Sequence, residues 1–210
     1  MNYKLKKMRF VLTSIILFML VMPGSALAAN SSQCFGTSSL TCGSNSALKL
    51  QEGFSRLGYS PSEASIGWIT RADIVNFLQN DPNAYGFHYS GHGYYDTNTG
   101  APVMDTDDGI VTKNDVIGNW HFVFVDSCES AANDGLARAF HIPGYSNRAF
   151  LGWYTTVYDS DSYAFDTFLV DLLTYEPIRQ AALDAANAVP GSGTTPIRFY
   201  GDSSYYGRPY

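Results

Sequence analysis

The sequence carries little positive charge and few metal-binding patterns, and both shortages argue against whole classes of function. Of 210 residues only 13 are lysine or arginine, against 19 aspartate or glutamate, for a net charge of −6. A protein that binds nucleic acid needs a basic face, so the charge balance argues against such a role. The sequence contains no HExxH or CxxC pattern, so the usual signatures of a zinc site are missing.

Only one long apolar run is present, and it lies near the N-terminus. The run from Phe10 to Met22 follows four basic residues and precedes Ala26-Leu27-Ala28, the small-x-small pattern of a signal-peptidase site. An uncleaved membrane anchor is the alternative, but the run is short for a membrane span. We therefore predict that residues 1–28 are a signal peptide and that the protein is secreted, with no membrane attachment after cleavage.

Cleavage after Ala28 changes the charge of the protein. It removes four basic and no acidic residues, which leaves 182 residues with 9 basic against 19 acidic side chains and a net charge of −10. A basic or cationic partner is attracted to such a surface more readily than an anionic one.

Three cysteines in an exported chain leave one unpaired. Cys34 and Cys42 lie close together in a Ser/Thr/Gly-rich segment and could form a disulfide. Residues 29–45, which include both, are predicted to be a flexible N-terminal arm. Cys128 is distant from this segment and follows a strand pattern. A buried structural thiol is the alternative interpretation of Cys128.

Strand and helix patterns alternate along residues 46–210. The short apolar runs at 85–93, 122–126 and 148–157 predict buried strands. Helices are predicted at 47–57, 70–78, 129–140, 162–173 and from Pro177 to Val189, and residues 94–108 are predicted to be a polar connection. This alternation predicts one α/β domain, a three-layer α/β/α sandwich with a mostly parallel central sheet.

Two of the predicted strands end in residues that could perform catalysis. Cys128 follows the strand at 122–126, and His92 ends the strand pattern at 85–93. Ligands of α/β sheets bind where the carboxyl ends of the strands meet. A cysteine nucleophile acts as the thiolate, which the N-terminus of a helix at 129–140 would favour. His92 would transfer the proton, and the backbone N–H groups of Gly93 and Cys128 could form an oxyanion hole.

The neighbouring polar residues have alternative roles. His88 and His92 have a spacing that suits zinc on a helix, but the glycines around them argue against a helix, so His88 is predicted to be a structural strand residue. His121 and His141 are predicted to be structural or exposed. Asp126 could cap the following helix, or it could form the floor of a pocket for a cationic side chain.

The sequence resembles the caspase-like (clan CD) cysteine peptidases. The residues that carry the resemblance are Phe-His-Tyr-Ser-Gly-His-Gly at 87–93 and Val-Asp-Ser-Cys at 125–128, which are similar to the His-Gly and Asp-x-Cys motifs of metacaspases and of CHAT and gingipain-like enzymes. The resemblance covers about residues 64–203. It implies a caspase-like fold and a catalytic dyad of His92 and Cys128. It also implies cleavage after Arg or Lys, with Asp126 binding that side chain.

The resemblance implies further residues and leaves gaps. Trp153 and Asp159 fall in the region that borders the substrate pocket of such folds. No counterpart of the family's first core strand is evident before Ala47, so a second acidic pocket residue is not identified. Some members need calcium, and Asp105, Asp107 and Asp108 could bind it, although their spacing does not fit an EF-hand. No other cofactor and no metal ligand is predicted.

The sequence therefore predicts a secreted cysteine endopeptidase that acts on proteins or peptides. One alternative is a caspase-like binding module without catalysis, for which the C-terminal aromatic residues would form the recognition surface: Phe199, Tyr200, Tyr205, Tyr206 and Tyr210. Another is a transpeptidase or ligase that uses the same dyad. The oligomeric state is not indicated.

Overall fold

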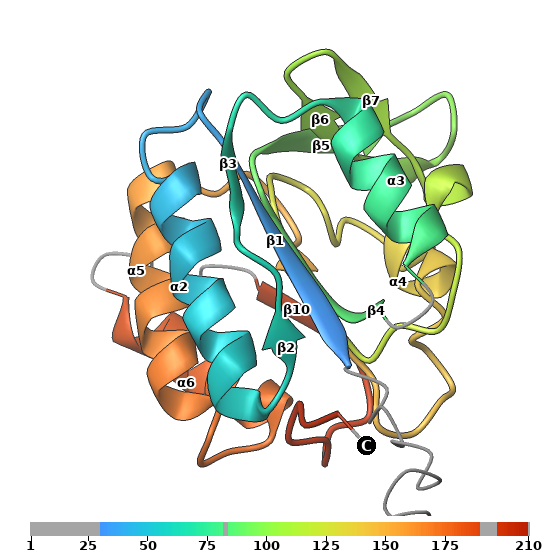
Figure 1. Cartoon of the computed structure of the whole chain (residues 1–210). Helices are drawn as coiled ribbons and strands as arrows, with labels where there is room; N and C mark the ends of the chain where they lie inside the picture. Colours follow the sequence, from blue (N-terminus) through green and yellow to red (C-terminus); the bar gives the residue numbers. More distant parts are fainter. Residues whose placement is uncertain (1–29, 82–83, 190–196, 210) are drawn as a thin grey trace, which may run out of the picture.

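The computed structural model of the chain describes residues 30–81, 84–189 and 197–209 (Figure 1). The predicted signal peptide and Tyr210 lie outside the described residues. A seven-stranded sheet forms the centre, in the order β10-β9-β8-β4-β1-β2, with β3 also paired to β1. Its strands are β1 (Ser31–Thr37), β2 (Ser60–Pro61), β3 (Ser65–Gly67), β4 (Ala84–Ser90), β8 (Phe122–Asp126), β9 (Ala149–Trp153) and β10 (Ile197–Gly201). Only the β9–β10 pair is antiparallel among the described strands of this sheet.

Helices cover both faces of the sheet (Figure 1). One face carries α2 (Gly43–Leu57), α5 (Asp159–Leu172) and α6 (Ile178–Ala188), and the other carries α3 (Arg71–Asn80), α4 (Gly135–Ala139) and the short 3-10 helix η1 (Lys113–Asp115). The predicted α/β sandwich with a mostly parallel central sheet is confirmed. Within the part of the chain that the structure describes, none of the helices has both the length and the apolarity to cross a bilayer.

Strand β8 runs through the middle of the core. Phe122 and Phe124 pack in the apolar cluster under α2, α5 and α6, whereas Val123 and Val125 pack in the cluster under α3 and α4. Successive side chains of a strand point to opposite faces, so a strand that is buried on both sides reads as a continuous apolar run. Burying each of these side chains stabilises the fold by about 1.5–3 kcal/mol. The strand thus fixes the residues that follow it at the carboxyl edge of the sheet.

The predicted flexible arm at residues 29–45 is wrong over most of its length. Residues 31–37 form β1, which pairs with β4 on one side and with β2 and β3 on the other, and α2 begins already at Gly43. The strand escaped prediction because several of its buried residues are polar. Gln33, for example, is buried and donates from Nε2 to the carbonyl oxygen of Glu63 at 2.9 Å.

The predicted disulfide between Cys34 and Cys42 is absent, and both are free thiols. Cys34 lies in β1 with its side chain in the apolar cluster under α2 and α5. Cys42 instead precedes α2, and its backbone N–H donates to Oδ2 of Asp159 at 2.9 Å. The segment between them connects a core strand to a helix and is not a surface loop closed on itself.

The predicted polar connection at 94–108 is also wrong. Strands β5 (His92–Asp96), β6 (Ala101–Thr106) and β7 (Gly109–Val111) form a separate three-stranded antiparallel sheet. This small sheet lies beyond the carboxyl end of β4, at the top of Figure 1. The residues that follow β4 are therefore part of ordered β-structure, with His92 as the first residue of β5.

Candidate active site

The carboxyl ends of β4 and β8 lie side by side. Ser90 is in register with Asp126, and the N–H of Gly91 donates to the carbonyl oxygen of Asp126 at 3.3 Å. His92 and Cys128 each follow two residues after this last aligned pair. The sheet therefore sends the two segments that carry them out from the same edge, as the strand patterns predict.

Close packing holds the two segments together beyond the sheet. A Cβ atom placed on Gly93 would lie 2.4 Å from Oγ of Ser127, a distance at which only a glycine fits. On the other side of Cys128, Oε2 of Glu129 accepts a hydrogen bond from the N–H of Tyr95 at 2.8 Å. The residues before and after Cys128 thus both contact β5, the strand that begins with His92.

Tyr89 positions His92, and the sequence analysis missed it. His92 is exposed, but its carbonyl oxygen accepts from the hydroxyl of buried Tyr89 at 3.3 Å, and the same hydroxyl donates to the carbonyl oxygen of Asp105 at 2.6 Å. Burial, with Asp105 and other carboxylates adding to it, raises the pKa of Tyr89, so the hydroxyl keeps its proton. A tyrosine inside an apolar strand, two residues before a glycine, is the signal that could have identified it.

Cys128 lies in a turn and not at the start of a helix, so this part of the prediction is wrong. The helix expected at 129–140 begins only at Gly135. Ser130 accounts for the difference, because its Oγ donates to the carbonyl oxygen of Val125 at 2.6 Å and accepts from the N–H of Trp153 at 2.9 Å. A serine that bonds to strands on both sides holds the chain in a turn. The helix dipole therefore does not act on the Cys128 thiol.

The turn at Cys128 has a strained backbone at the next residue. Glu129 adopts the left-handed conformation with φ of 57°, which costs about 1–2 kcal/mol for a residue other than glycine. Its N–H donates to the carbonyl oxygen of Thr155 at 3.1 Å, and Sγ of Cys128 donates to the carbonyl oxygen of Val157 at 3.5 Å. The backbone N–H of Cys128 makes no hydrogen bond to any residue in the described ranges. Such a free donor beside a thiol is suited to an oxyanion.

Asp126 does not line an open pocket, so its predicted role as a pocket floor is wrong. Only 2% of the residue is exposed, and its carboxylate accepts three hydrogen bonds: from Nε1 of Trp153 at 2.6 Å, from Oγ of Ser90 at 3.0 Å and from Oγ of Ser162. It does not cap a helix either. Burial raises the pKa of Asp126, and the three donors oppose this effect.

The other two predicted pocket residues differ from each other. Trp153 is fully buried and contacts Phe124 and Phe165, so it does not border a surface pocket. Asp159 is partly buried at the first position of α5, two residues after the carbonyl group that Cys128 contacts. Asp159 is thus the acidic residue of the predicted set that stays at the surface near Cys128.

The remaining polar candidates lie apart from Cys128. His88 is fully buried in β4, whereas His92 is exposed in β5, so the two do not share a site. Asp107 and Asp108 accept hydrogen bonds from the N–H groups of Ile69 and Arg71, at 2.6 Å each. Calcium binding by these aspartates stays a prediction.

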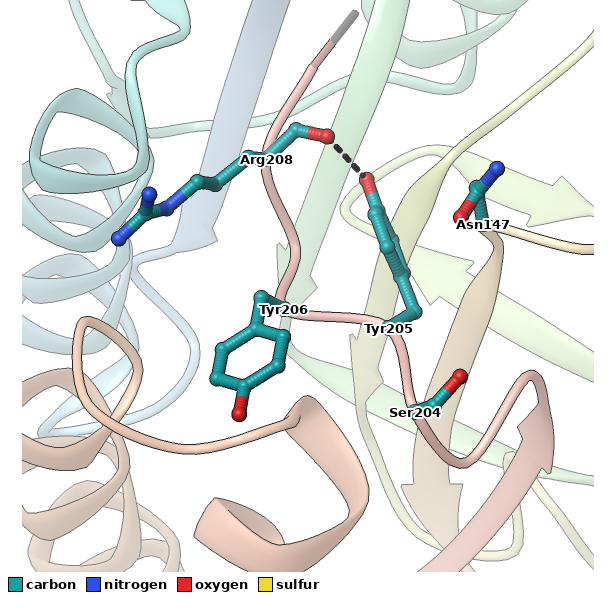
Figure 2. Close-up of a pocket in the computed structure, with 5 residues that line it drawn as sticks. All are labelled: Asn147, Ser204, Tyr205, Tyr206 and Arg208. Carbon is teal, nitrogen blue, oxygen red and sulfur yellow. Dashed lines mark hydrogen bonds between the residues drawn. The ribbon is translucent and has the colours of Figure 1, made fainter.

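Two cavities lie at the amino edge of the sheet, opposite to Cys128. One has a volume of about 370 Å³ and is lined by Asn147, Ser204, Tyr205, Tyr206 and Arg208 (Figure 2). In Figure 2 the Tyr205 hydroxyl points at the Arg208 carbonyl oxygen, to which it donates at 3.0 Å. The other, of about 250 Å³, lies beside Leu78, Ala84 and Trp120. Neither includes His92 or Cys128.

Comparisons with known proteins identify the fold. No protein-family model and no curated protein sequence matches the chain. Among solved structures, it is similar to the Arg-specific cysteine proteinase gingipain R, with a TM-score of 0.54 and 12% identity over 84% of this chain and 47% of that one. It is also similar to the complex of the pro- and mature domains of RgpB from Porphyromonas gingivalis, with a TM-score of 0.57 and 10% identity over 85% of this chain and 48% of that one.

These neighbours confirm the predicted resemblance to caspase-like peptidases at the level of the fold. At such low identity the similarity shows the architecture alone, and the chain spans about half the length of the structures it matches.

Proposed function

We propose that the protein is a secreted cysteine endopeptidase with Cys128 as nucleophile and His92 as proton carrier. One observation carries the proposal: Gly93 packs on Ser127, and Glu129 binds the backbone of Tyr95, so the residues on both sides of Cys128 contact the strand that begins with His92. The gingipain-like fold supports it, because the two structural neighbours are cysteine proteinases. A predicted signal peptide supports secretion.

The chemistry follows the general scheme for thiol nucleophiles. The Cys128 thiolate attacks the scissile carbonyl carbon and forms a carbon–sulfur bond, while the N–H groups of Cys128 and Gly93 stabilise the oxyanion. Protonated His92 gives its proton to the departing amine, which breaks the peptide bond. Water, deprotonated by His92, then hydrolyses the thioester and regenerates the thiol.

A preference for Arg or Lys at the cleaved position is the second part of the proposal. With Asp126 buried, the preference depends on Asp159, which lies at the surface two residues after Val157. The predicted net charge of −10 after cleavage of the signal peptide also favours a cationic substrate over an anionic one.

A peptidase assay with matched variants tests the proposal. The mature chain should cleave Arg- and Lys-ended fluorogenic peptides faster than Leu-ended ones, and Asp159→Asn should reduce this difference. Cys128→Ala should abolish cleavage, and His92→Ala should reduce kcat by about 10²–10⁴-fold, since it removes the proton carrier. Asp171→Asn, at the exposed end of α5, is the control and should retain full activity. A wild-type protein that leaves a broad peptide library intact, with or without calcium, would refute the proposal.

Thiol labelling separates an enzyme from a binding module. The Cys128 thiol, as part of a dyad, should react with iodoacetamide at mildly acidic pH. Burial, and then Asp159, raise the pKa of the Cys42 thiol, and Cys34 is buried, so both should react slowly. If Cys128 reacts no faster than Cys42, catalysis by this residue is wrong.

The binding module remains a second candidate because of the cavity in Figure 2. Tyr205 and Tyr206, two of the aromatic residues that suggested it, line this cavity at the edge opposite to Cys128. An unlabelled Cys128 together with peptide or sugar binding that Tyr206→Ala weakens would favour this function. A transpeptidase would instead form amide products when an amine nucleophile is added to the peptide assay.

A further inference from the structure

Three ionisable side chains meet in the interior below the Cys128 edge. They are His88 on β4, Asp126 at the end of β8 and Asp166 on α5, and one ligand atom of each lies within 4.8 Å of those of the other two. All three are at most 2% exposed. The ring of Phe124 packs against His88 and in turn against Phe165. Three different elements therefore bring one imidazole and two carboxylates to the same buried place.

Most of the polar atoms in this cluster have no partner in the protein. Among the described residues, neither ring nitrogen of His88 makes a hydrogen bond, and neither carboxylate oxygen of Asp166 makes one of ordinary geometry, although the Ser46 side chain lies beside that carboxylate. A buried polar group without a partner costs about 1–3 kcal/mol, and a charged one more. Four such atoms in one place indicate that a component of the native site completes the cluster.

The charge of the cluster indicates what kind of component this is. Asp126 and Asp166 bring two carboxylates together, and no lysine or arginine of the described residues forms an ion pair with either. A dication would neutralise the pair.

We propose that His88, Asp126 and Asp166 bind a structural divalent transition-metal ion, with zinc as the expected metal. One imidazole nitrogen and two carboxylate oxygens are ligands that zinc accepts, and tetrahedral zinc sets its ligand atoms about 3.3 Å apart. The three atoms, now within 4.8 Å of one another, would close by up to about 1.5 Å around the ion to reach this geometry. The ion would link β4, β8 and α5 directly below the catalytic edge.

The contacts of Asp126 fit the outer shell of a metal site. Trp153, Ser90 and Ser162 donate to its carboxylate and fix its orientation. Such hydrogen bonds to a ligating carboxylate are a common feature of metal centres. The three ligands are buried, away from solvent and from any substrate at the sheet edge. The ion would therefore stabilise the fold and take no part in the peptidase reaction.

Metal retention by an untagged mature chain tests the proposal. The parent is Cys128→Ala, so that zinc bound by the dyad cannot be counted. This chain is first stripped of metals, then incubated with zinc chloride and passed through gel filtration. Mass spectrometry should then find one zinc ion per molecule. His88→Gln and Asp166→Asn, added to the parent, should retain less than about a tenth of this. Asp171→Asn, on the exposed side of α5, is the control and should retain the full amount.

Thermal unfolding supplies a second measurement that does not depend on the variants folding equally well. Zinc at 100-fold excess over its dissociation constant should raise the melting temperature of the parent by roughly 5–10 °C. Asp166→Asn should lose this shift, yet in chelator it should melt at or above the parent, because one buried charge is gone.

The outcomes that overturn the proposal are distinct from those that overturn the peptidase. If the parent retains no zinc and shows no thermal shift, the cluster of His88, Asp126 and Asp166 binds no metal, and protons shared among the three side chains neutralise its charge instead. Equal retention by Asp166→Asn places the ion elsewhere. Either result refutes the metal site and leaves the activity of the wild-type chain unaffected.

Discussion

Replacing Gly93 with alanine tests the contact on which the candidate active site depends. The added Cβ would lie 2.4 Å from Oγ of Ser127 and 2.8 Å from the carbonyl oxygen of Val103. The serine side chain could rotate, but the Val103 carbonyl is part of the backbone of β6, which pairs with β5. The distance from the new Cβ to this carbonyl oxygen is shorter than an ordinary contact by roughly 0.6 Å. The substitution must therefore push β5 away from Ser127.

The expected magnitudes follow from this overlap. Overpacking of a buried site costs about 1–3 kcal/mol, so Gly93→Ala should lower the melting temperature by roughly 2–12 °C. The loss of activity should be larger than the loss of stability suggests. His92 and the Gly93 N–H both move with β5, and a displacement of about 1 Å in a catalytic group can reduce the rate about 100-fold.

The assay compares kcat/KM and urea unfolding with a matched glycine variant. Gly109→Ala lies in β7 of the same small sheet, and its Cβ would meet only the Arg71 side chain, at 3.6 Å. It should change stability by less than about 0.5 kcal/mol and leave kcat/KM intact. If Gly93→Ala is as stable and as active as Gly109→Ala, then β5 does not pack on Ser127 as described.

Three further variants test other parts of the structure. Gly36→Ala should lower the free energy of unfolding in urea by about 3 kcal/mol or more, because its Cβ would lie 2.3 Å from the carbonyl oxygen of Gly43. If residues 31–37 were instead a flexible arm, Gly36→Ala would be as stable as the control variant Ser39→Ala. Trp153→Phe removes a donor from the buried Asp126 carboxylate and should cost about 1.5–3 kcal/mol in the same assay; an unchanged midpoint would contradict that hydrogen bond. Burial, with Arg148 adding to it, lowers the pKa of His121 from 6.5, so the stability from its neutral form is complete above pH 6.5 and is lost as the pH falls below that value. The free energy of unfolding in urea should therefore fall less between pH 8 and pH 5 for His121→Gln than for the wild type. Equal falls in the two proteins would rule out this contribution.

Most of the helices and strands could be predicted where local pattern and burial agree. Strand β8 is apolar on both faces before Asp126, and all residues of β4 except Tyr85 are buried, which makes these runs distinctive. Helix α3 begins at a capping box of Thr70 and Asp73, which the spacing of these two residues predicts and the structure confirms.

Strand β1 could not be predicted because its polar side chains find their partners far away in the sequence. Gln33 bonds to Glu63 and Ser65, some 30 positions later, and no local pattern indicates this. The small sheet at 92–111 was missed for a related reason, since its turns are rich in the residues typical of loops.

The candidate site was predictable in part. The two neighbouring parallel strands lead into the segments that carry His92 and Cys128, so both segments leave the sheet at one edge, and this follows from topology alone. The burial of Asp126 does not follow, because Trp153, 27 residues further along, covers its carboxylate. The turn at Cys128 depends likewise on Ser130, whose hydroxyl bonds to the backbone of both neighbouring strands.

The pairing of β1 with β4 has a practical consequence for anyone who shortens the chain. A version trimmed to start at residue 46 would lack the strand that pairs with β4, and the hydrogen-bonding groups of β4 would become a bare sheet edge. Exposed edges of apolar strands recruit other chains and cause aggregation. Expression should therefore begin no later than Asn30, with any affinity tag separated from Ser31 by a spacer.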